Sequence, residues 1–131
     1  MWSVTINEDR KLVLVKSSAS LDYASIRSAL HQIYLKDQGR YSSYDRFLDL
    51  SKIGDVNAHF DSIRDQIYWY RKANPFENGV KTAVYLPFGI LRAVVEIYVQ
   101  EAGIENGNLM VTDSVDRCAE YLQVGRDVLR I

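Results

Sequence analysis

Three titratable side chains in one short segment are the first candidates for chemistry. Asp55, His59 and Asp61 are spaced as D-x3-H-x-D, and carboxylate and imidazole groups can bind a metal or act as general acids and bases. A zinc site would need a further His or Cys, and His31 and Cys118 lie far away in the sequence. His59 is also typical of a surface histidine at the start of a helix. We therefore predict no metal site and no cofactor.

A second set of side chains bears on enzyme chemistry. Asp49 lies in the strand-like run 47–50, and with Asp55 and His59 it would form an acid–base group if the fold brought the three together. Cys118, the single cysteine, occupies an inward position on the last predicted helix, where a thiol acts as a small apolar side chain. The sequence contains no G-x-S-x-G nucleophile turn and no glycine-rich phosphate loop. We predict a non-catalytic protein, with the acid–base group as the open alternative.

The composition is that of one globular domain. The chain has 131 residues, of which 47% are hydrophobic and 25% are charged, and its formal net charge is -1. This length fits a single domain over 1–131, and the charge favours neither nucleic acid nor an anionic membrane as a partner. No apolar run is long enough to span a bilayer, no signal peptide opens the chain, and a lone cysteine fits a reducing compartment. We predict a cytoplasmic protein without membrane insertion.

Five short runs of β-branched and apolar residues have strand character. The first two, 2–6 and 12–15, are separated by a polar stretch and predict a hairpin. The other three are 47–50, 80–86 and 109–112. A helix-length segment follows every run from the second onward, which gives the order β-β-α-β-α-β-α-β-α. Strands that alternate with helices form parallel crossovers, so we predict an α/β domain with a mostly parallel mixed sheet of about five strands and four helices.

The first two predicted helices are marked by apolar residues at helical spacing and by signals at their ends. Ser20 or Asp22 offers a cap for the first, which should stop by Gly39. The second is marked by apolar residues between 60 and 70 and is ended by Asn74-Pro75, because proline cannot continue a helix.

The last two predicted helices follow the fourth and fifth strands. Pro87 suits the start of the third, whose apolar stripe runs through 91–102. Thr112 or Asp113 is the expected cap of the fourth. Residues 124–131 form a C-terminal tail with apolar side chains that would dock on the domain.

With this element order, the chain resembles the STAS-like (SpoIIAA-like) domains related to bacterial anti-sigma factor antagonists. The segment RFLDLSKI (46–53) is similar to the strand and "D-L-S" turn of that family. KTAVYLPFGILRAVVEIY (81–98) resembles its next strand, loop and helix, and MVTDSVDRCAEYL (110–122) resembles its ending. The opening hairpin also fits, so the resemblance covers nearly the whole chain. It implies a SpoIIAA-like fold whose strand–helix units wind as a superhelix, an architecture shared with lipophile-binding CRAL-TRIO domains.

The resemblance also implies where function should lie. In anti-sigma factor antagonists, a serine or threonine of "D-S-S-G" shortly after "D-L-S" is phosphorylated by a partner kinase. Here that position falls at 57–60, where Ala58 and His59 replace the acceptor hydroxyls. The resemblance therefore implies a bacterial regulatory protein-interaction module that lacks the phosphorylation switch. Its expected contact surface consists of Gly54, Asp55, Asn57, Ala58 and His59.

The alternative function is binding of a small lipophilic ligand, as the likeness to CRAL-TRIO domains implies. In open parallel sheets, ligands bind beyond the carboxyl ends of the strands. Here those ends lead into the loops at 51–59, 87–89 and 112–114. The expected ligand pocket is formed by Pro87, Phe88, Gly89 and Leu91. Ordinary core packing is the competing interpretation of these residues.

The predicted partner is a protein whose identity the sequence does not give. A homodimer is left open, through the edge strand at Trp2 or through the tail, because unpaired strand edges and exposed apolar patches favour association.

Overall fold

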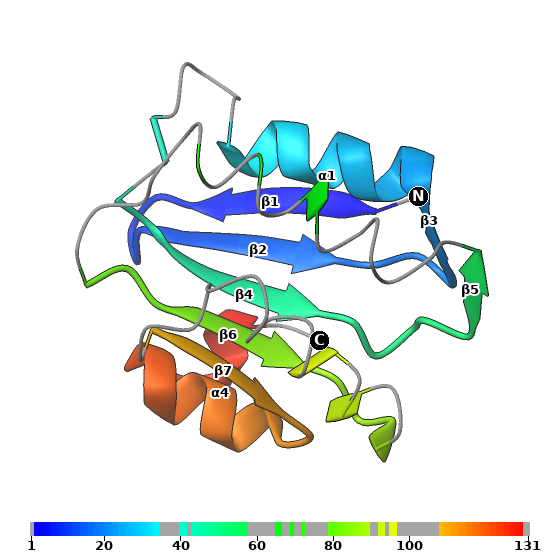
Figure 1. Cartoon of the computed structure of the whole chain (residues 1–131). Helices are drawn as coiled ribbons and strands as arrows, with labels where there is room; N and C mark the ends of the chain where they lie inside the picture. The colour runs from blue at the N-terminus through cyan, green and yellow to red at the C-terminus, as the bar shows by residue number, and fades with distance from the viewer. Residues whose placement is uncertain are drawn as a thin grey trace.

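The fold is built on a five-stranded mixed sheet (Figure 1). The computed structural model describes residues 2–34, 40–41, 43–57, 65–66, 69, 72, 79–89, 92–93, 95–96 and 108–129. The strands of the main sheet are β1 (Ser3–Asn7), β2 (Leu12–Lys16), β4 (Asp45–Asp49), β6 (Thr82–Tyr85) and β7 (Leu109–Thr112). Their order is β1-β2-β4-β6-β7, with β1 antiparallel to β2 and every other pair parallel. The predicted α/β class, the hairpin and the five strands are confirmed.

A second, two-stranded sheet was not predicted from the sequence. β3 (Ser20–Asp22) pairs in parallel with β5 (Asp55–Asn57). Each strand has three residues, which is too short for the alternation of polar and apolar side chains that identifies a strand. Asp22 also has the capping role expected of it, because its Oδ1 accepts a hydrogen bond from the Ser25 backbone N–H at 2.9 Å.

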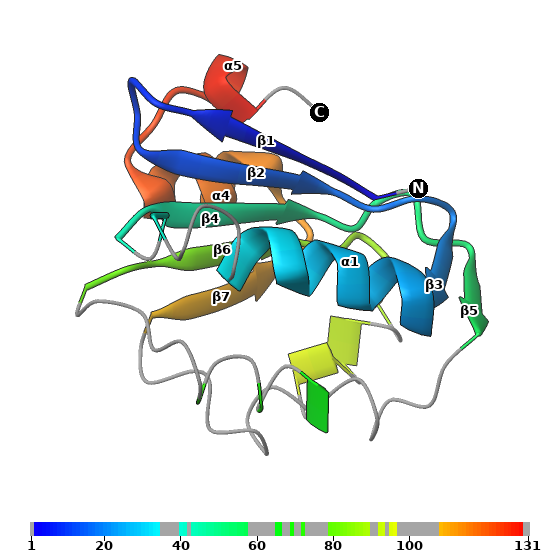
Figure 2. The ribbon, with the colours of Figure 1, turned by 90° about the horizontal axis from the view of Figure 1, so that it is seen from above.

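Three helices have defined bounds: α1 (Tyr23–Tyr34), α4 (Val115–Leu122) and α5 (Arg126–Leu129). Figure 2 shows α1 on one face of the sheet and α4 and α5 on the other. Four helices were expected, and α1 and α4 are the first and last of them. In the second expected helix, residues 65, 66, 69 and 72 are helical, and in the third, residues 89, 92, 93, 95 and 96 are helical. The third was expected to start at Pro87, but Pro87 and Phe88 precede its first helical residue, Gly89. The other positions of these two helices lie outside the described residues, as does Gly39.

Both ends of α4 follow from local chemistry, although the expected cap is wrong by one or two residues. Ser114, not Thr112 or Asp113, is the N-cap, and its hydroxyl accepts a hydrogen bond from the Arg117 N–H at 3.2 Å. Thr112 still belongs to β7, and its Oγ1 accepts from the Ser114 N–H at 3.2 Å. The helix ends at Gln123, whose φ of 58° is left-handed.

The core is divided by the sheet into two apolar clusters. The cluster on the α1 face contains Val13, Val15, Ile26, Tyr41, Leu50, Ile53, Val84 and Leu86. The cluster on the α4 face contains Leu12, Phe47, Ala83, Cys118, Ala119, Leu122 and Leu129. Strands covered on both faces are apolar along their whole length, which explains the continuous runs of β2 and β6. The expected docking of the tail is confirmed by α5, whose Leu129 is 1% exposed.

Cys118 belongs to this core, as its position on the helix predicted. Its side chain is completely buried. Burial, reinforced by the nearby negative charge of Asp49, raises the pKa of the thiol to about 11. A thiol with this pKa is almost wholly protonated at neutral pH, so Cys118 acts as an apolar core residue. No helix within the described ranges is long and apolar enough to cross a membrane.

Candidate functional site

The carboxyl ends of the parallel strands lie side by side and form one edge of the sheet. Backbone hydrogen bonds continue past the strands: Leu50 N–H donates to Tyr85 C=O at 2.9 Å, and Leu86 N–H donates to Thr112 C=O at 2.9 Å. The loops that leave β4, β6 and β7 therefore begin next to one another. We call this region, formed by residues 17–19, 50–54, 86–89 and 112–114, the carboxyl edge.

The loop after β4 is held by a buried carboxylate. Asp49 is 3% exposed, and its Oδ1 accepts hydrogen bonds from the backbone N–H and the hydroxyl of Ser51, at 2.9 and 2.5 Å. The loop then reaches Gly54, whose N–H donates to Ala19 C=O at 2.8 Å. Asp49 therefore shapes the turn that leads into β5, a structural role that competes with the acid–base role considered from the sequence.

The predicted contact surface is described in part. Gly54 is exposed at the carboxyl edge. Asp55 and Asn57 are the first and last residues of β5 and pair with Ser20 and Asp22 of β3. Their side chains lie outside the described part of the structure, as do Ala58, His59 and Asp61. The prediction that the D-x3-H-x-D segment forms no metal site therefore stays a prediction.

The loop after β6 presents an exposed aromatic side chain. Phe88 is 46% exposed, and its C=O accepts a hydrogen bond from Arg92 N–H at 2.8 Å, as in a first helical turn. Arg92 Nη1 donates to Leu86 C=O at 3.2 Å and lies 3.8 Å from Asp113 Oδ2, so this guanidinium bridges the loops after β6 and β7. Both side chains of the ion pair reach solvent, so the pair adds little to the free energy of folding. Its main effect is to connect the two loops.

One hydroxyl at the carboxyl edge is buried without a partner. Ser17 follows β2, is 5% exposed, and donates its backbone N–H to Asp49 C=O at 3.0 Å. Its Oγ has no hydrogen-bond partner among the protein groups described. Such a group destabilises the folded state, because it loses its hydrogen bonds to water without replacement.

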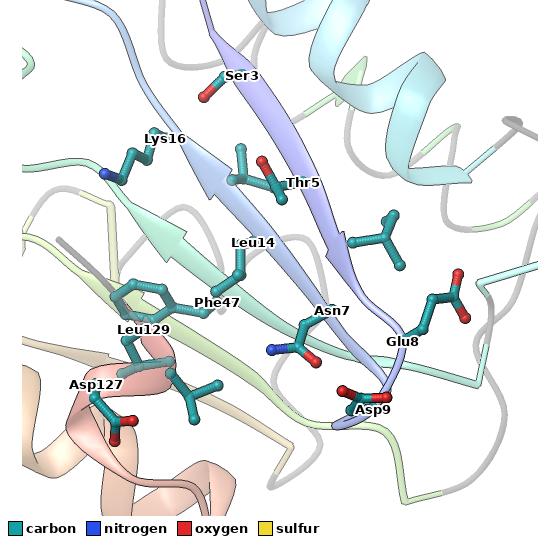
Figure 3. A pocket seen from close by; sticks show the side chains of 13 residues that line it. Ser3, Thr5, Asn7, Glu8, Asp9, Leu14, Lys16, Phe47, Asp127 and Leu129 are labelled. Atoms are coloured by element: carbon teal, nitrogen blue, oxygen red, sulfur yellow. The ribbon is translucent and has the colours of Figure 1, made fainter.

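A groove on the opposite face was not found by sequence reasoning. Figure 3 shows its floor on the face of β1, β2 and β4 that α1 does not cover, with α5 as one wall. The groove has a volume of about 860 Å³ and is lined by Ser3, Thr5, Ile6, Asn7, Glu8, Asp9, Leu14, Val15, Lys16, Phe47, Asp127, Val128 and Leu129. The positions expected to form a ligand pocket, Pro87, Phe88 and Gly89, do not line it, and Leu91 lies outside the described residues.

The groove is charged differently at its two ends. Carboxylates of Glu8 and Asp9 lie at the turn between β1 and β2, and the Lys16 side chain lies at the other end of β2. The Glu8 carboxylate also accepts a hydrogen bond from the Tyr44 hydroxyl at 2.7 Å, which raises the pKa of Tyr44. The described residues contain no group of three or more acidic, histidine or cysteine side chains able to hold a metal ion.

No protein-family model matches the sequence, and no curated protein matches it.

Proposed function

We propose that this chain is a non-catalytic, STAS-like protein-interaction module of a bacterial regulatory type, acting in the cytoplasm and contacting a protein partner through the carboxyl edge. The observation that carries the proposal is Phe88, a large apolar side chain that is 46% exposed at the carboxyl edge. Aromatic side chains at the centre of an interface commonly account for much of the binding energy.

The arrangement around Phe88 supports a binding surface. The Arg92 guanidinium connects the loops after β6 and β7, and Asp49 fixes the loop after β4 through Ser51. A surface whose loops are already ordered loses less conformational entropy on binding. The strand order β1-β2-β4-β6-β7, in which each new parallel strand adds to the same side, supports the STAS-like part of the proposal.

Two described side chains support a non-catalytic role. The Asp49 carboxylate is buried and accepts hydrogen bonds from Ser51 within a turn, and Cys118 is buried with a raised thiol pKa. Neither group is exposed to a substrate, as a nucleophile or general base must be. The module would therefore act by binding, without the phosphoacceptor hydroxyl that Ala58 and His59 replace.

The experiment is capture of a partner from the source cell by purified wild-type protein and by two variants of the carboxyl edge. Phe88→Ala and the Asp55→Ala/Asn57→Ala/His59→Ala triple variant should each lose captured partner by about tenfold or more, the usual effect of removing a central contact. Asp9→Ala/Arg10→Ala changes the exposed turn at the opposite end of the sheet and serves as the matched control. Capture that Phe88→Ala and the triple variant leave intact, with melting unchanged, would place the contact elsewhere.

Binding of a small lipophilic ligand is the second candidate, favoured by the presence of the groove. Its apolar floor is formed by Leu14, Phe47 and Leu129, but Ser3 and Thr5 and four charged side chains share the lining. Sites for apolar ligands are mostly lined by apolar and aromatic side chains, so the protein partner is the better supported reading. Native mass spectrometry separates the two: a co-purified small molecule released by denaturation favours the ligand, and the bare chain mass counts against it.

A further inference from the structure

Strand β1 is one edge of the main sheet, and the register shows which of its backbone groups point outward. On the side of β2 that faces β4, Asp45 N–H donates to Lys11 C=O at 3.2 Å, and Ser17 N–H donates to Asp49 C=O at 3.0 Å. The odd-numbered residues around β2 thus direct their backbone groups to β4. Because these groups alternate in direction along a strand, the even-numbered residues of β2 face β1.

The same alternation then applies to β1. Thr5 is opposite Leu14 of β2 and forms a hydrogen-bonded pair with it. Its neighbours Val4 and Ile6 therefore direct their N–H and C=O groups away from the sheet. No other strand in the described ranges pairs with that side of β1.

The sequence of β1 contains none of the devices that block edge pairing. Ser3–Asn7 reads SVTIN, with no charged residue, proline or glycine, and its register with β2 runs one to one without a bulge. Proteins usually protect an edge strand with one of these features, since open N–H and C=O groups template the addition of another strand.

We propose that a second copy of this chain adds to β1 in antiparallel orientation, with the two-fold axis passing through Thr5. This register places Val4 of each copy opposite Ile6 of the other. Each of these two pairs can exchange two N–H···O=C bonds, because both residues direct their groups outward. The two main sheets then form one continuous sheet. This surface is separate from the carboxyl edge, so the proposal is independent of the proposed function.

The side chains fit this two-fold arrangement. An axis perpendicular to the sheet keeps the faces matched, so Val4 and Ile6, which pack against the core cluster on the α1 face, continue an apolar row. On the other face, the exposed Ser3 and Thr5 meet Asn7 and Thr5 of the second copy, and pairs of hydroxyls across strands are favourable.

Charge favours a second copy over an unrelated extended peptide. One end of the groove beside β1 carries the carboxylates of Glu8 and Asp9, and the other carries the Lys16 ammonium. Glu8 already pairs with Arg40 at 3.7 Å, so the free carboxylate at this end of the groove is that of Asp9. Antiparallel addition brings Asp9 of one copy toward Lys16 of the other, and does so twice, while Arg10 and Lys11 of the same turn do not line the groove. The chain is thus complementary to itself at this edge.

The test uses disulfide formation to read the register. Thr5→Cys on the axis would face its own copy in a non-hydrogen-bonded pair, with Cα atoms about 4.5 Å apart, a distance that suits a disulfide. Ser3→Cys is equally exposed on the same strand and face, but two copies of it would lie about 14 Å apart along the strands, which no disulfide spans. The native Cys118 is buried and gives little background.

We expect the covalent dimer of Thr5→Cys to form faster than that of Ser3→Cys by at least about tenfold, since pairing raises the effective thiol concentration to the millimolar range. Sedimentation velocity of the wild type should show a mass rising from 15.1 kDa toward twice that value as concentration increases. Equal cross-linking of the two variants, or a constant mass of one chain up to about 1 mM, would overturn the proposal.

A second variant removes the pairing without a new thiol. Val4→Pro deletes an N–H that points away from β2, and proline is tolerated at such positions of edge strands. It should abolish the concentration-dependent mass while the circular dichroism spectrum is retained. A dimer that persists in Val4→Pro would show that another surface holds it.

Discussion

Truncation of Leu129 tests whether the short helix α5 is part of the hydrophobic core. Leu129 is 1% exposed and belongs to the same cluster as Leu12 and Phe47. Leu129→Ala removes three carbon atoms, worth about 0.8 kcal/mol each in transfer free energy, or about 2.4 kcal/mol together. The cavity left behind adds to this, so we expect the free energy of unfolding to fall by about 3 kcal/mol.

The length of α5 sets an upper limit on that loss. The helix has four residues, and a helix this short is held by its tertiary contacts because it is unstable alone. If the truncated side chain no longer holds it, α5 detaches and the remaining domain keeps the rest of its stability. The loss then equals the free energy with which α5 docks, and both outcomes are read from the same urea unfolding curves.

Two neighbouring positions are matched controls for this measurement. Val128 is half-buried, so Val128→Ala should destabilise by about 1 kcal/mol. The Arg126 side chain is 68% exposed, so Arg126→Ala should change stability by less than about 0.5 kcal/mol. Reactivity of the Cys118 thiol gives a second readout, since detachment of α5 would uncover part of its cluster. If Leu129→Ala behaves like Arg126→Ala, the docking of α5 described above is refuted.

Three further predictions concern single groups. Folding raises the pKa of the Cys118 thiol from 9.0 to about 11, so the free energy of unfolding should fall as the pH rises from about 9 to 11. This loss is at most about 3 kcal/mol, and alkaline melting curves of Cys118→Ala should lack it. Ser17→Ala removes a buried hydroxyl without a partner, so the free energy of unfolding should rise by about 1 kcal/mol in urea titration, and a fall would reveal a hidden bond. Ser114→Ala removes the cap of α4 and should lower the free energy of unfolding by about 1 kcal/mol, with Ser114→Asp restoring it.

The main sheet could be predicted because its signals are local. β2 and β6 are covered on both faces, so LVLVK and TAVY are apolar almost throughout. The alternation of β1 is equally local, with Ser3 and Thr5 exposed and Val4 and Ile6 half-buried. The parallel order of strands then follows from the helix-length segments between them.

The small sheet and the groove could not be predicted, because both depend on contacts between distant segments. Ser20 of β3 pairs with Asp55 of β5. A strand of three residues has too short a pattern to predict pairing with a segment so far along the chain. The groove lies where α5 packs beside β1, β2 and β4 on the face that α1 does not cover. The apolar tail predicted docking, but no sequence pattern says which part of the sheet a four-residue helix will cover.

The two proposed surfaces predict how a complex should assemble. The two-fold axis at Thr5 relates the strands of the two copies in antiparallel fashion, so the carboxyl edges point in opposite directions. Neither edge is covered by the other copy, and a dimer would bind two partner molecules. Val4→Pro should therefore reduce the captured complex from two chains of each protein to one of each, without weakening the single contact at Phe88. On a surface densely coated with partner, the dimer should dissociate more slowly than Val4→Pro by a factor of about a hundred or more, because two linked contacts reinforce each other. If Val4→Pro instead abolishes binding of the partner in solution, β1 is itself the partner site and the division of roles between the two surfaces is wrong.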